Sequence, residues 1–272
     1  MGERDIMDFS TPPVDLIMVT YGQADMCRKN VQNIIENTNY PNFTFTVIDN
    51  HSLDDTWQEV CKELYKHPNT QGFQADKNKG YGSACNTGAR LTQNPIIIFL
   101  NSDVSVKEGH EDWLTHLVDA LMESDDVAVA GPKLVNKDNL LMGTGVVGTN
   151  KNRRVRNFNE EDKGQCEEPI NVLSVCGAVL AVKRDVFMQY GGFDKIFFHY
   201  FEEEDLQWKF RYDGLRIRYE PKSVMIHDHM GSTPSDVDKI VLNGFAQEGQ
   251  AKFYQRWGAW IEADTTVYGG DE

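Results

Sequence analysis

The sequence predicts an α/β fold in which a mostly parallel central sheet is flanked by helices on both faces. Short apolar, β-branched runs alternate with segments whose apolar residues recur at helical spacing, and the connections between them are short. The 272 residues are 40% hydrophobic and 25% charged, which is typical of a folded globular chain with one substantial core. We therefore expect one domain over residues 1–272.

The first half of the chain predicts successive strand–helix units. The run that opens them, VDLIMVT, is apolar and β-branched, as in strands buried on both faces of a sheet. Proline and asparagine end the first helix, and a polar cluster caps the second. The expected elements are strand Val14–Thr20, helix Met26–Ile35, strand Thr44–Ile48, helix Thr56–Tyr65, helix Tyr81–Leu91 and strand Pro95–Leu100.

The second half is less regular. A strand at Val127–Ala130 precedes the polar stretch Asn136–Glu168, which predicts a long surface excursion. An aromatic-rich helix at Ile240–Ile261 is expected to pack on the body of the protein. Between them we expect strand Val172–Val182, helix Arg184–Tyr190, a turn at Gly191-Gly192, helix Asp205–Tyr212 and strand Arg216–Tyr219.

Composition excludes several classes of function. Lys and Arg number 27 against 42 Asp and Glu, and a net charge of −15 disfavours binding to nucleic acid or to an anionic membrane surface. The five cysteines form no CxxC pair, which disfavours a disulfide framework or a structural zinc site. The N-terminus has no apolar run of signal-peptide length, and no stretch elsewhere approaches the length of a membrane span, so we expect a cytoplasmic protein without a transmembrane segment.

Polar clusters directly follow three of the predicted strands. They are Thr20-Tyr21, Asp49-Asn50 and Asn101-Ser102-Asp103. Ligands of parallel α/β sheets bind at the carboxyl ends of the strands, so these clusters predict a binding site. A carboxylate held there, such as Asp103, suits Mg²⁺ or Mn²⁺ with phosphate oxygens and water. The alternative is an Asn-Ser-Asp turn that caps a helix.

Four consecutive acids, Glu202 to Asp205, stand at the start of a predicted helix after an aromatic run. The helix dipole favours one or two acids there but does not readily explain four. Burial and mutual repulsion would raise the pKa of at least one of these carboxyls, as a general base near neutral pH requires.

Two further motifs carry candidate ligands. His227 and His229 alternate after an apolar run, so both face one side if the strand continues, and an imidazole there can join a carboxylate on manganese. A buried, hydrogen-bonded histidine is the alternative. Asn78–Gly88 combines glycines with a helix start, which suits an anion or a ribose. It has the spacing of neither a Walker loop nor a dinucleotide fingerprint.

Taken in order, these motifs resemble the family 2 glycosyltransferases with the GT-A fold, in particular the rhamnosyltransferase and galactofuranosyltransferase-like branch. The ordered series is far more specific than any single motif. Its members are Val19–Gly22, Val47–Asp55, Asn78–Gly88, Phe99–Val104, Cys176–Phe187, Gly191–Gly214 and Ile226–Ser232.

This resemblance implies a metal-dependent, inverting transfer of a hexosyl or deoxyhexosyl group in polysaccharide biosynthesis. The donor would be a UDP- or dTDP-sugar, the acceptor a hydroxyl of a glycan or glycoconjugate, and the cofactor Mn²⁺ or Mg²⁺. Residues 14–132 would form the nucleotide-sugar half and residues 133–235 the acceptor and catalytic half. Residues 236–272 would form a C-terminal helical tail.

The resemblance also implies roles for individual residues. Asp103 and His227 would bind the metal, and Glu203 would be the general base, with Glu202 and Asp205 as the other candidates. Asp205 would otherwise orient the acceptor or the helix start. Thr20 and Asp49 would hold the nucleoside base. The remaining nucleotide-sugar candidates are Tyr21, Asn50, Asn78, Gly82, Asn86, Asn101 and Ser102.

Two other functions stay open. A sugar nucleotidyltransferase uses a similar sheet and metal, but the segment after the first strand, VTYGQADM, lacks the basic residues that grip a triphosphate. A degenerate GT-A protein that only binds carbohydrate or nucleotide is the second alternative, because the metal triplet begins with Asn101 rather than an acid. The basic cluster Lys151–Arg156 is either a solvated loop or a lid over the donor.

Overall fold

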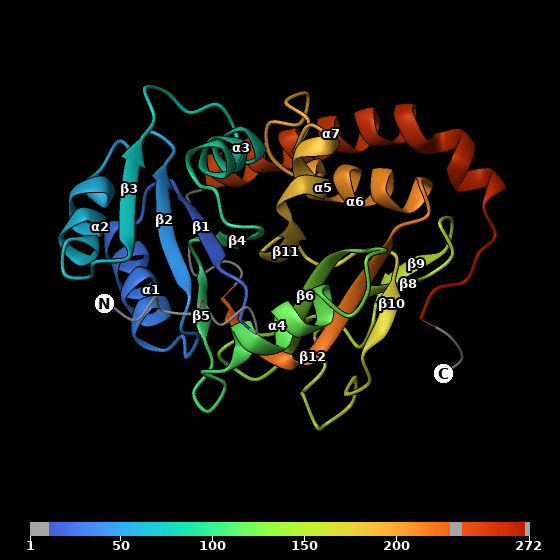
Figure 1. Ribbon diagram of the computed structural model, residues 1–272. Coiled ribbons are helices and arrows are strands. Elements are labelled where there is room, and N and C mark those ends of the chain that lie inside the picture. Colours follow the sequence, from blue (N-terminus) through green and yellow to red (C-terminus); the bar gives the residue numbers. More distant parts are fainter. Residues whose placement is uncertain (1–10, 229–235, 270–272) are drawn as a thin grey trace, which may run out of the picture.

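The computed structural model describes residues 11–228 and 236–269 and has a large sheet at its centre (Figure 1). The strands of this sheet are β1 (Val14–Thr20), β2 (Phe43–Asp49), β3 (Thr70–Gln74), β4 (Ile96–Asn101), β5 (Val104–Val106), β6 (Val127–Val135), β7 (Leu141–Gly143), β10 (Ile170–Val172), β11 (Val179–Lys183) and β12 (Arg216–His227). A separate antiparallel pair is formed by β8 (Val146–Gly148) and β9 (Arg153–Val155).

Four of the seven neighbouring pairs in the main strand order of the central sheet are parallel, in agreement with the mostly parallel sheet that the sequence predicts. The order is β10-β12-β6-β11-β4-β1-β2-β3, with β5 beside β12 and β7 beside β6. Strands β4, β1, β2 and β3 run parallel, and β12 runs parallel to β6. Strand β11 is antiparallel to both β4 and β6. The carboxyl ends of β1, β2 and β4 therefore meet at one edge of the sheet.

Helices cover both faces of the sheet (Figure 1). They are α1 (Ala24–Glu36), α2 (Thr56–Leu64), α3 (Tyr81–Leu91), α4 (Trp113–Leu121), α5 (Arg184–Gln189), α6 (Glu202–Tyr212) and α7 (Asp236–Ala263). Side chains of α1, α2 and α4 share one core cluster with one face of β1, and those of α3, α5 and α6 share a second cluster with its other face. This two-sided burial explains the apolar run Leu16–Val19 in the middle of β1.

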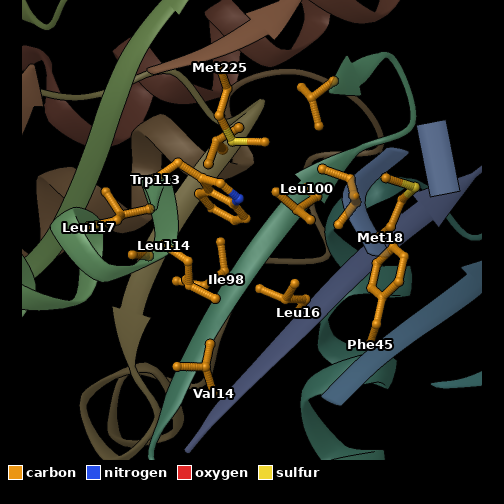
Figure 2. Packing of buried hydrophobic residues seen from close by; sticks show 14 of the residues in the cluster. Val14, Leu16, Met18, Phe45, Ile98, Leu100, Trp113, Leu114, Leu117 and Met225 are labelled. Atoms are coloured by element: carbon orange, nitrogen blue, oxygen red, sulfur yellow. The ribbon is translucent and has the colours of Figure 1, made fainter. Parts of the chain in front are cut away.

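Helix α4 closes the first of these two cores. Figure 2 shows Trp113, Leu114 and Leu117 of this helix packed towards Ile98 and Leu100 of β4. All five side chains are fully buried. The sequence analysis did not anticipate this helix, although its apolar residues recur at positions one, two, five and nine of WLTHLVDAL, a helical spacing.

The aromatic tail forms α7, which packs on α6 through a third apolar cluster, as expected. Trp208 of α6 lies within 6.0 Å of the rings of Phe253, Trp257 and Trp260 of α7, measured between centroids. Among the described residues, no helix combines the length and the apolarity needed to cross a membrane.

Several expected elements were wrong in their extent, and the strands expected at Val127–Ala130 and Arg216–Tyr219 continue to Val135 and His227. The single strand Val172–Val182 divides into β10 and β11, because residues 173–178 leave the sheet and the backbone of Val175 pairs with the side chain of Gln207 at 2.8 and 3.0 Å. The helix expected from Asp205 begins at Glu202, since all four acids stand in its first turn. The excursion Asn136–Glu168 also contains β7, β8 and β9.

Candidate active site

The end of β2 is fixed by a buried carboxylate. Asp49 lies opposite Thr20 in the β1–β2 register and accepts hydrogen bonds from its hydroxyl at 3.2 Å and from Gln74 Nε2 at 3.1 Å. The amide of Ser52 donates to the same carboxylate at 3.0 Å, and the Ser52 hydroxyl donates as well. Asp49 therefore holds the loop after β2 in shape rather than presenting a free carboxylate to a ligand.

The next residue joins this loop to the start of α3. Asn50 donates to Asn78 Oδ1 at 2.9 Å and accepts from the Lys79 amide at 3.3 Å. Asn78 Oδ1 also accepts from the Gly80 amide at 2.9 Å. The structure thus brings together two of the expected nucleotide-binding side chains. Tyr21, directly after β1, is 53% exposed at the same edge of the sheet.

Asn86 has a different environment from the one expected. It is buried in α3, its Nδ2 donates to the carbonyl of Phe193 at 2.8 Å, and its Oδ1 accepts from the Phe193 amide at 2.9 Å. Both polar atoms of this side chain therefore fasten α3 to the loop after Gly192. Its role in lining a nucleotide pocket stays a prediction that this geometry does not favour.

Asp103 and His227 lie next to each other in the candidate site. Asp103 lies in the turn between β4 and β5, and His227 ends β12 opposite Val104. His227 Nε2 lies 3.4 Å from Asp103 Oδ1. Burial alone would lower the pKa of His227, but hydrogen bonds to Asp103 and Cys176 raise it to about 10. The neighbouring Ser102 carbonyl accepts from Asn30 Nδ2 at 2.7 Å, which fixes this turn.

This pair can hold a divalent cation once the imidazole of His227 loses its proton, because only the neutral ring binds a metal. Asp103 Oδ1 is buried, and beyond its contact with His227 at 3.4 Å it has no hydrogen-bond partner within the described part of the chain. In residues 11–228 and 236–269, no three His, Cys, Asp or Glu side chains gather as a metal-binding group. Magnesium and related cations often take only one or two protein ligands and complete their shell with phosphate oxygens and water. His229, the other histidine of this motif, lies outside the described residues.

The four acids at the start of α6 lie in unlike surroundings. Tyr200 and Phe201 just before them have φ angles of 70° and 71°, a left-handed conformation that costs side-chain-bearing residues about 1 kcal/mol or more each. Glu204 accepts hydrogen bonds from Ser174 Oγ at 2.9 Å and from Trp208 Nε1 at 3.0 Å. Glu204 is therefore occupied in joining α6 to the body of the protein.

Asp205 is bound by side chains of the C-terminal helix α7. It is fully buried, and its two oxygens lie 2.8 and 2.7 Å from Nη1 of Arg256. Trp257 Nε1 donates to it at 2.9 Å, and Lys209 Nζ lies 2.8 Å away. A carboxylate held by two cations and an indole is a poor proton acceptor, so the geometry disfavours Asp205 as the base. The geometry also gives no support to the expected contact between Asp205 and an acceptor.

Glu202 and Glu203 remain as candidates for the base. Each has one buried carboxylate oxygen, Oε2, without a hydrogen-bond partner among the described residues. Burial and the charge of Glu203 raise the pKa of Glu202 well above its usual range. Burial and the charge of Glu204 raise the pKa of Glu203 to about 7. Glu202 therefore favours its protonated form, whereas Glu203 exchanges a proton near neutral pH.

The segment Cys176–Ala178 joins these groups into one site. Cys176 hydrogen-bonds His227, the backbone of Gly177 lies against the side chain of Glu203, and the Ala178 carbonyl accepts from the Asn101 amide at 2.9 Å. Three groups therefore meet around these consecutive residues. They are the Asp103–His227 pair, the end of β4 and the candidate base. The sequence analysis quoted this segment as a motif but assigned no site role to it.

Electrostatic coupling supports the same convergence. Burial raises the pKa of Tyr200, and the charges of Glu202, Asp103 and Glu203 raise it further. Burial likewise raises the pKa of the Cys27 thiol, with contributions from Asp49 and Asp103. Tyr200 is therefore coupled to the acids of α6 and to Asp103, and Cys27 is coupled to Asp49 and to Asp103. Neither residue was among the expected site residues.

The basic cluster Lys151–Arg156 braces α7. Lys151 Nζ lies 2.6 Å from Glu262 Oε2, and the Arg153 guanidinium lies 5.0 Å from the ring centre of Trp208. These contacts support a structural surface loop rather than a lid over the donor.

Replacing Arg256 by alanine is expected to destabilise the protein by about 3 kcal/mol. The change removes one of the two cations that hold the fully buried carboxylate of Asp205, and losing a partner of a buried ion pair is costly. The measurement is the free energy of unfolding in urea. Lys151→Ala is the matched control, since it breaks an ion pair to the same helix whose side chains are 62% and 64% exposed, and about 0.5 kcal/mol is expected. Equal losses in the two variants would contradict a structural role for the Asp205 pair.

The sequence matches a known family over most of its length. The profile described as "Glycosyl transferase family 2" matches residues 15–191. The chain is 26% identical over 234 residues to the O-antigen biosynthesis protein RfbC of Myxococcus xanthus, covering 83% of this chain and 18% of that protein. It is 31% identical over 172 residues to a pre-mycofactocin glycosyltransferase of Mycobacterium tuberculosis, covering 61% of this chain and 32% of that protein. The chain thus spans at most about a third of these two relatives.

A further relative is matched over most of its own length. The N-acetylglucosaminyl-diphospho-decaprenol L-rhamnosyltransferase of Mycobacterium tuberculosis is 27% identical over 252 residues, with 83% of this chain and 79% of that protein covered.

Solved structures share the fold. A mannosyltransferase from Pyrobaculum calidifontis in complex with GDP-Man and Mn²⁺ superimposes with a TM-score of 0.61 at 19% identity, covering 84% of this chain and 59% of that one. GalNAc-T7 with UDP, GalNAc and Mn²⁺ superimposes with a TM-score of 0.64 at 16% identity, covering 81% and 44%.

Proposed function

Because the chain belongs to glycosyl transferase family 2 and has the GT-A fold, we propose that it moves a sugar from a nucleotide diphosphate sugar to an acceptor hydroxyl. The observation that carries this proposal is the meeting of three groups around Cys176–Ala178. These are the Asp103–His227 pair, the Glu203 carboxylate and the carboxyl end of β4. A single-step inverting transfer needs these parts, a site for the departing diphosphate and one base.

The chemistry follows from the surroundings of each group. The acceptor oxygen attacks the anomeric carbon while the bond from that carbon to the diphosphate oxygen breaks, which inverts the configuration there. Glu203 takes the proton of the acceptor hydroxyl, since its pKa of about 7 makes it an effective base at neutral pH. A divalent cation held by Asp103 and His227 would, when bound, offset the negative charge on the leaving nucleotide.

The donor's nucleotide would lie along the strand ends. Thr20, Asp49 and Asn50 shape the edge of the sheet there, and Tyr21 is exposed beside them. The resemblance of the motifs implies a UDP- or dTDP-sugar donor carrying a hexose or deoxyhexose, and a glycan or glycoconjugate acceptor in polysaccharide biosynthesis. The names of the O-antigen protein and the rhamnosyltransferase support this class of product. The Mn²⁺ bound in two structural neighbours supports manganese or magnesium as the cofactor.

Release of nucleoside diphosphate from a donor panel tests the proposal. The purified protein is incubated with UDP-, dTDP- and GDP-sugars in the presence of Mn²⁺, and the released nucleotide is quantified by chromatography. We expect slow hydrolysis of one class of donor, which stops when the metal is chelated. Donor binding without release from any donor would instead indicate a nucleotide- or carbohydrate-binding module. Formation of nucleotide sugar from a triphosphate and a sugar phosphate would indicate a nucleotidyltransferase.

A further inference from the structure

We propose that Gly177 is a positioning residue for the base of the proposed transfer reaction, because the missing side chain at this position provides the space that Glu203 occupies. The proposal rests on the proposed function and adds to it a residue that determines where the base stands. A β-carbon at residue 177 would lie 2.6 Å from Cγ, 3.0 Å from Cδ and 3.1 Å from Cβ of Glu203. Real β-carbons essentially never approach another heavy atom within 3.0 Å. The three nearest atoms all belong to one side chain, so the clash would fall on the base.

The backbone of residues 175–178 cannot easily move aside. The Ala178 carbonyl is bonded to the Asn101 amide at 2.9 Å, and the side chain of Cys176 is bonded to His227. On its other side, Gly177 accepts a long hydrogen bond from the Tyr81 hydroxyl at 3.5 Å. Added volume at residue 177 must therefore displace the Glu203 side chain rather than the strand-end segment.

The backbone of Glu203 is held to the same segment. Gln207 is fully buried, and its amide exchanges two hydrogen bonds with Val175, at 2.8 and 3.0 Å. Its Nε2 also donates to the carbonyl of Glu203 at 3.1 Å. Gln207 thus fixes the first turn of α6 against residue 175. Only the Glu203 side chain is left to absorb the change.

Gly82 has the equivalent position beside the other acid and provides a matched control. A β-carbon there would lie 3.2 Å from Cγ of Glu202 and 2.9 Å from Cβ of Phe193. Gly82→Ala should therefore crowd Glu202 and the Phe193 loop. It should leave the path between Glu203 and the acceptor unchanged.

The kinetic test compares Gly177→Ala with and without a shorter base. A displacement of about 1 Å at a reacting group can cost about 10²-fold in rate, so we expect Gly177→Ala to lower kcat at least 10-fold with the donor KM nearly unchanged. Glu203→Asp alone should lower kcat, since the carboxylate is withdrawn by one methylene. In the Gly177→Ala variant the base is already displaced, so the same shortening should lower kcat much less than it does in the wild type, although Cγ, the nearest atom, remains. A loss carried by KM, or strictly additive losses, would overturn the proposal.

Gly82→Ala completes the kinetic comparison. We expect Glu203→Asp to lower kcat in the Gly82→Ala variant as much as in the wild type, because residue 82 contacts the other acid. If Glu203→Asp lowers kcat equally little in both glycine variants, the effect is not specific to residue 177 and the proposal fails.

Thermal unfolding provides a second readout that needs no substrate. We expect Gly177→Ala to lower Tm and Glu203→Ala to restore most of the loss in the double variant, because that change removes Cγ and Cδ, the two nearest atoms. Glu202→Ala should restore none of it. A double variant no more stable than Gly177→Ala overturns the contact itself. If the wild type turns over no donor, the proposed function fails together with the catalytic part of this inference, whereas the unfolding data still decide the contact.

Discussion

Replacing Glu203 by glutamine is expected to lower the rate of sugar transfer about 10²–10⁴-fold while leaving the donor KM nearly unchanged. The amide keeps the size of the side chain but cannot accept the proton of the acceptor hydroxyl. Initial rates of nucleotide release, measured with the donor that the wild type hydrolyses, give the effect. Of the four acids of α6, Glu203 combines an unpartnered buried oxygen, among the described residues, with a pKa of about 7.

Glu202→Gln is the matched control for this prediction. The pKa of Glu202 is raised well above its usual range by burial and by Glu203, so its neutral acid form is already close in shape to glutamine. We expect a change in rate of less than about 10-fold, well below the contribution of a general base. If this variant loses the activity and Glu203→Gln keeps it, the two acids have exchanged roles.

The pH dependence provides an independent check on Glu203. The wild-type rate should rise with pH and level off above about 7, as the base loses its proton. Stability should change in the opposite direction. Between pH 4.5 and about 7 the native state holds a proton on Glu203 that the unfolded state has lost, so this group's contribution to the free energy of unfolding falls as pH rises. Glu203→Gln should therefore gain stability over the wild type at pH 8, by about 2 kcal/mol, and gain little at pH 4.

Replacing Asp103 by alanine should weaken Mn²⁺ binding and abolish metal-dependent turnover. The change removes the charged ligand of the pair and leaves only the imidazole of His227. The loss in affinity should exceed the about 10–100-fold cost of losing a mere outer-shell partner. Binding of Mn²⁺ is measured by the decrease of the free-ion electron paramagnetic resonance signal, in the presence of the nucleoside diphosphate. This readout does not depend on activity.

Asp228→Asn is the control for this metal experiment. Asp228 follows His227 directly, but its carboxylate pairs with Lys137 at the surface and its side chain is 30% exposed. We expect its Mn²⁺ affinity to equal that of the wild type. If Asp103→Ala binds Mn²⁺ as tightly as the wild type, Asp103 is not a metal ligand. If a chelator does not change the wild-type rate, the reaction does not depend on a metal.

The arrangement of the site follows from features that the sequence displays openly. Strands β1, β2 and β4 are rich in apolar and β-branched residues, so their carboxyl ends and the polar residues that follow them can be located from sequence alone. Parallel pairing then brings Thr20, Asp49 and Asn101 to one edge without any further information. The family match confirms the resemblance on which the expected fold rested.

The different roles of the four acids of α6 could not be predicted from the sequence. Asp205 is occupied by Arg256, which is 51 residues further along the chain, and Glu204 is occupied by Ser174, which is 30 residues earlier. Nothing in the sequence EEED distinguishes these acids, because their partners are set by the packing of α7 and of the segment after β10. The break between β10 and β11 has the same origin, since a side chain of α6 takes the hydrogen bonds of Val175.

The bond between Asp205 and Arg256 makes the C-terminal helix part of the machinery that holds the acids. Glu203 stands two residues before Asp205 in the first turn of α6, and Trp257 and Arg256 clamp that turn from α7. Helix α7 therefore cannot be exchanged without affecting the first turn of α6. A chimaera that carries the C-terminal helix of another transferase on this sheet needs an arginine and a tryptophan at positions 256 and 257. Without them, the first turn of α6 loses the contacts that hold its acids in position.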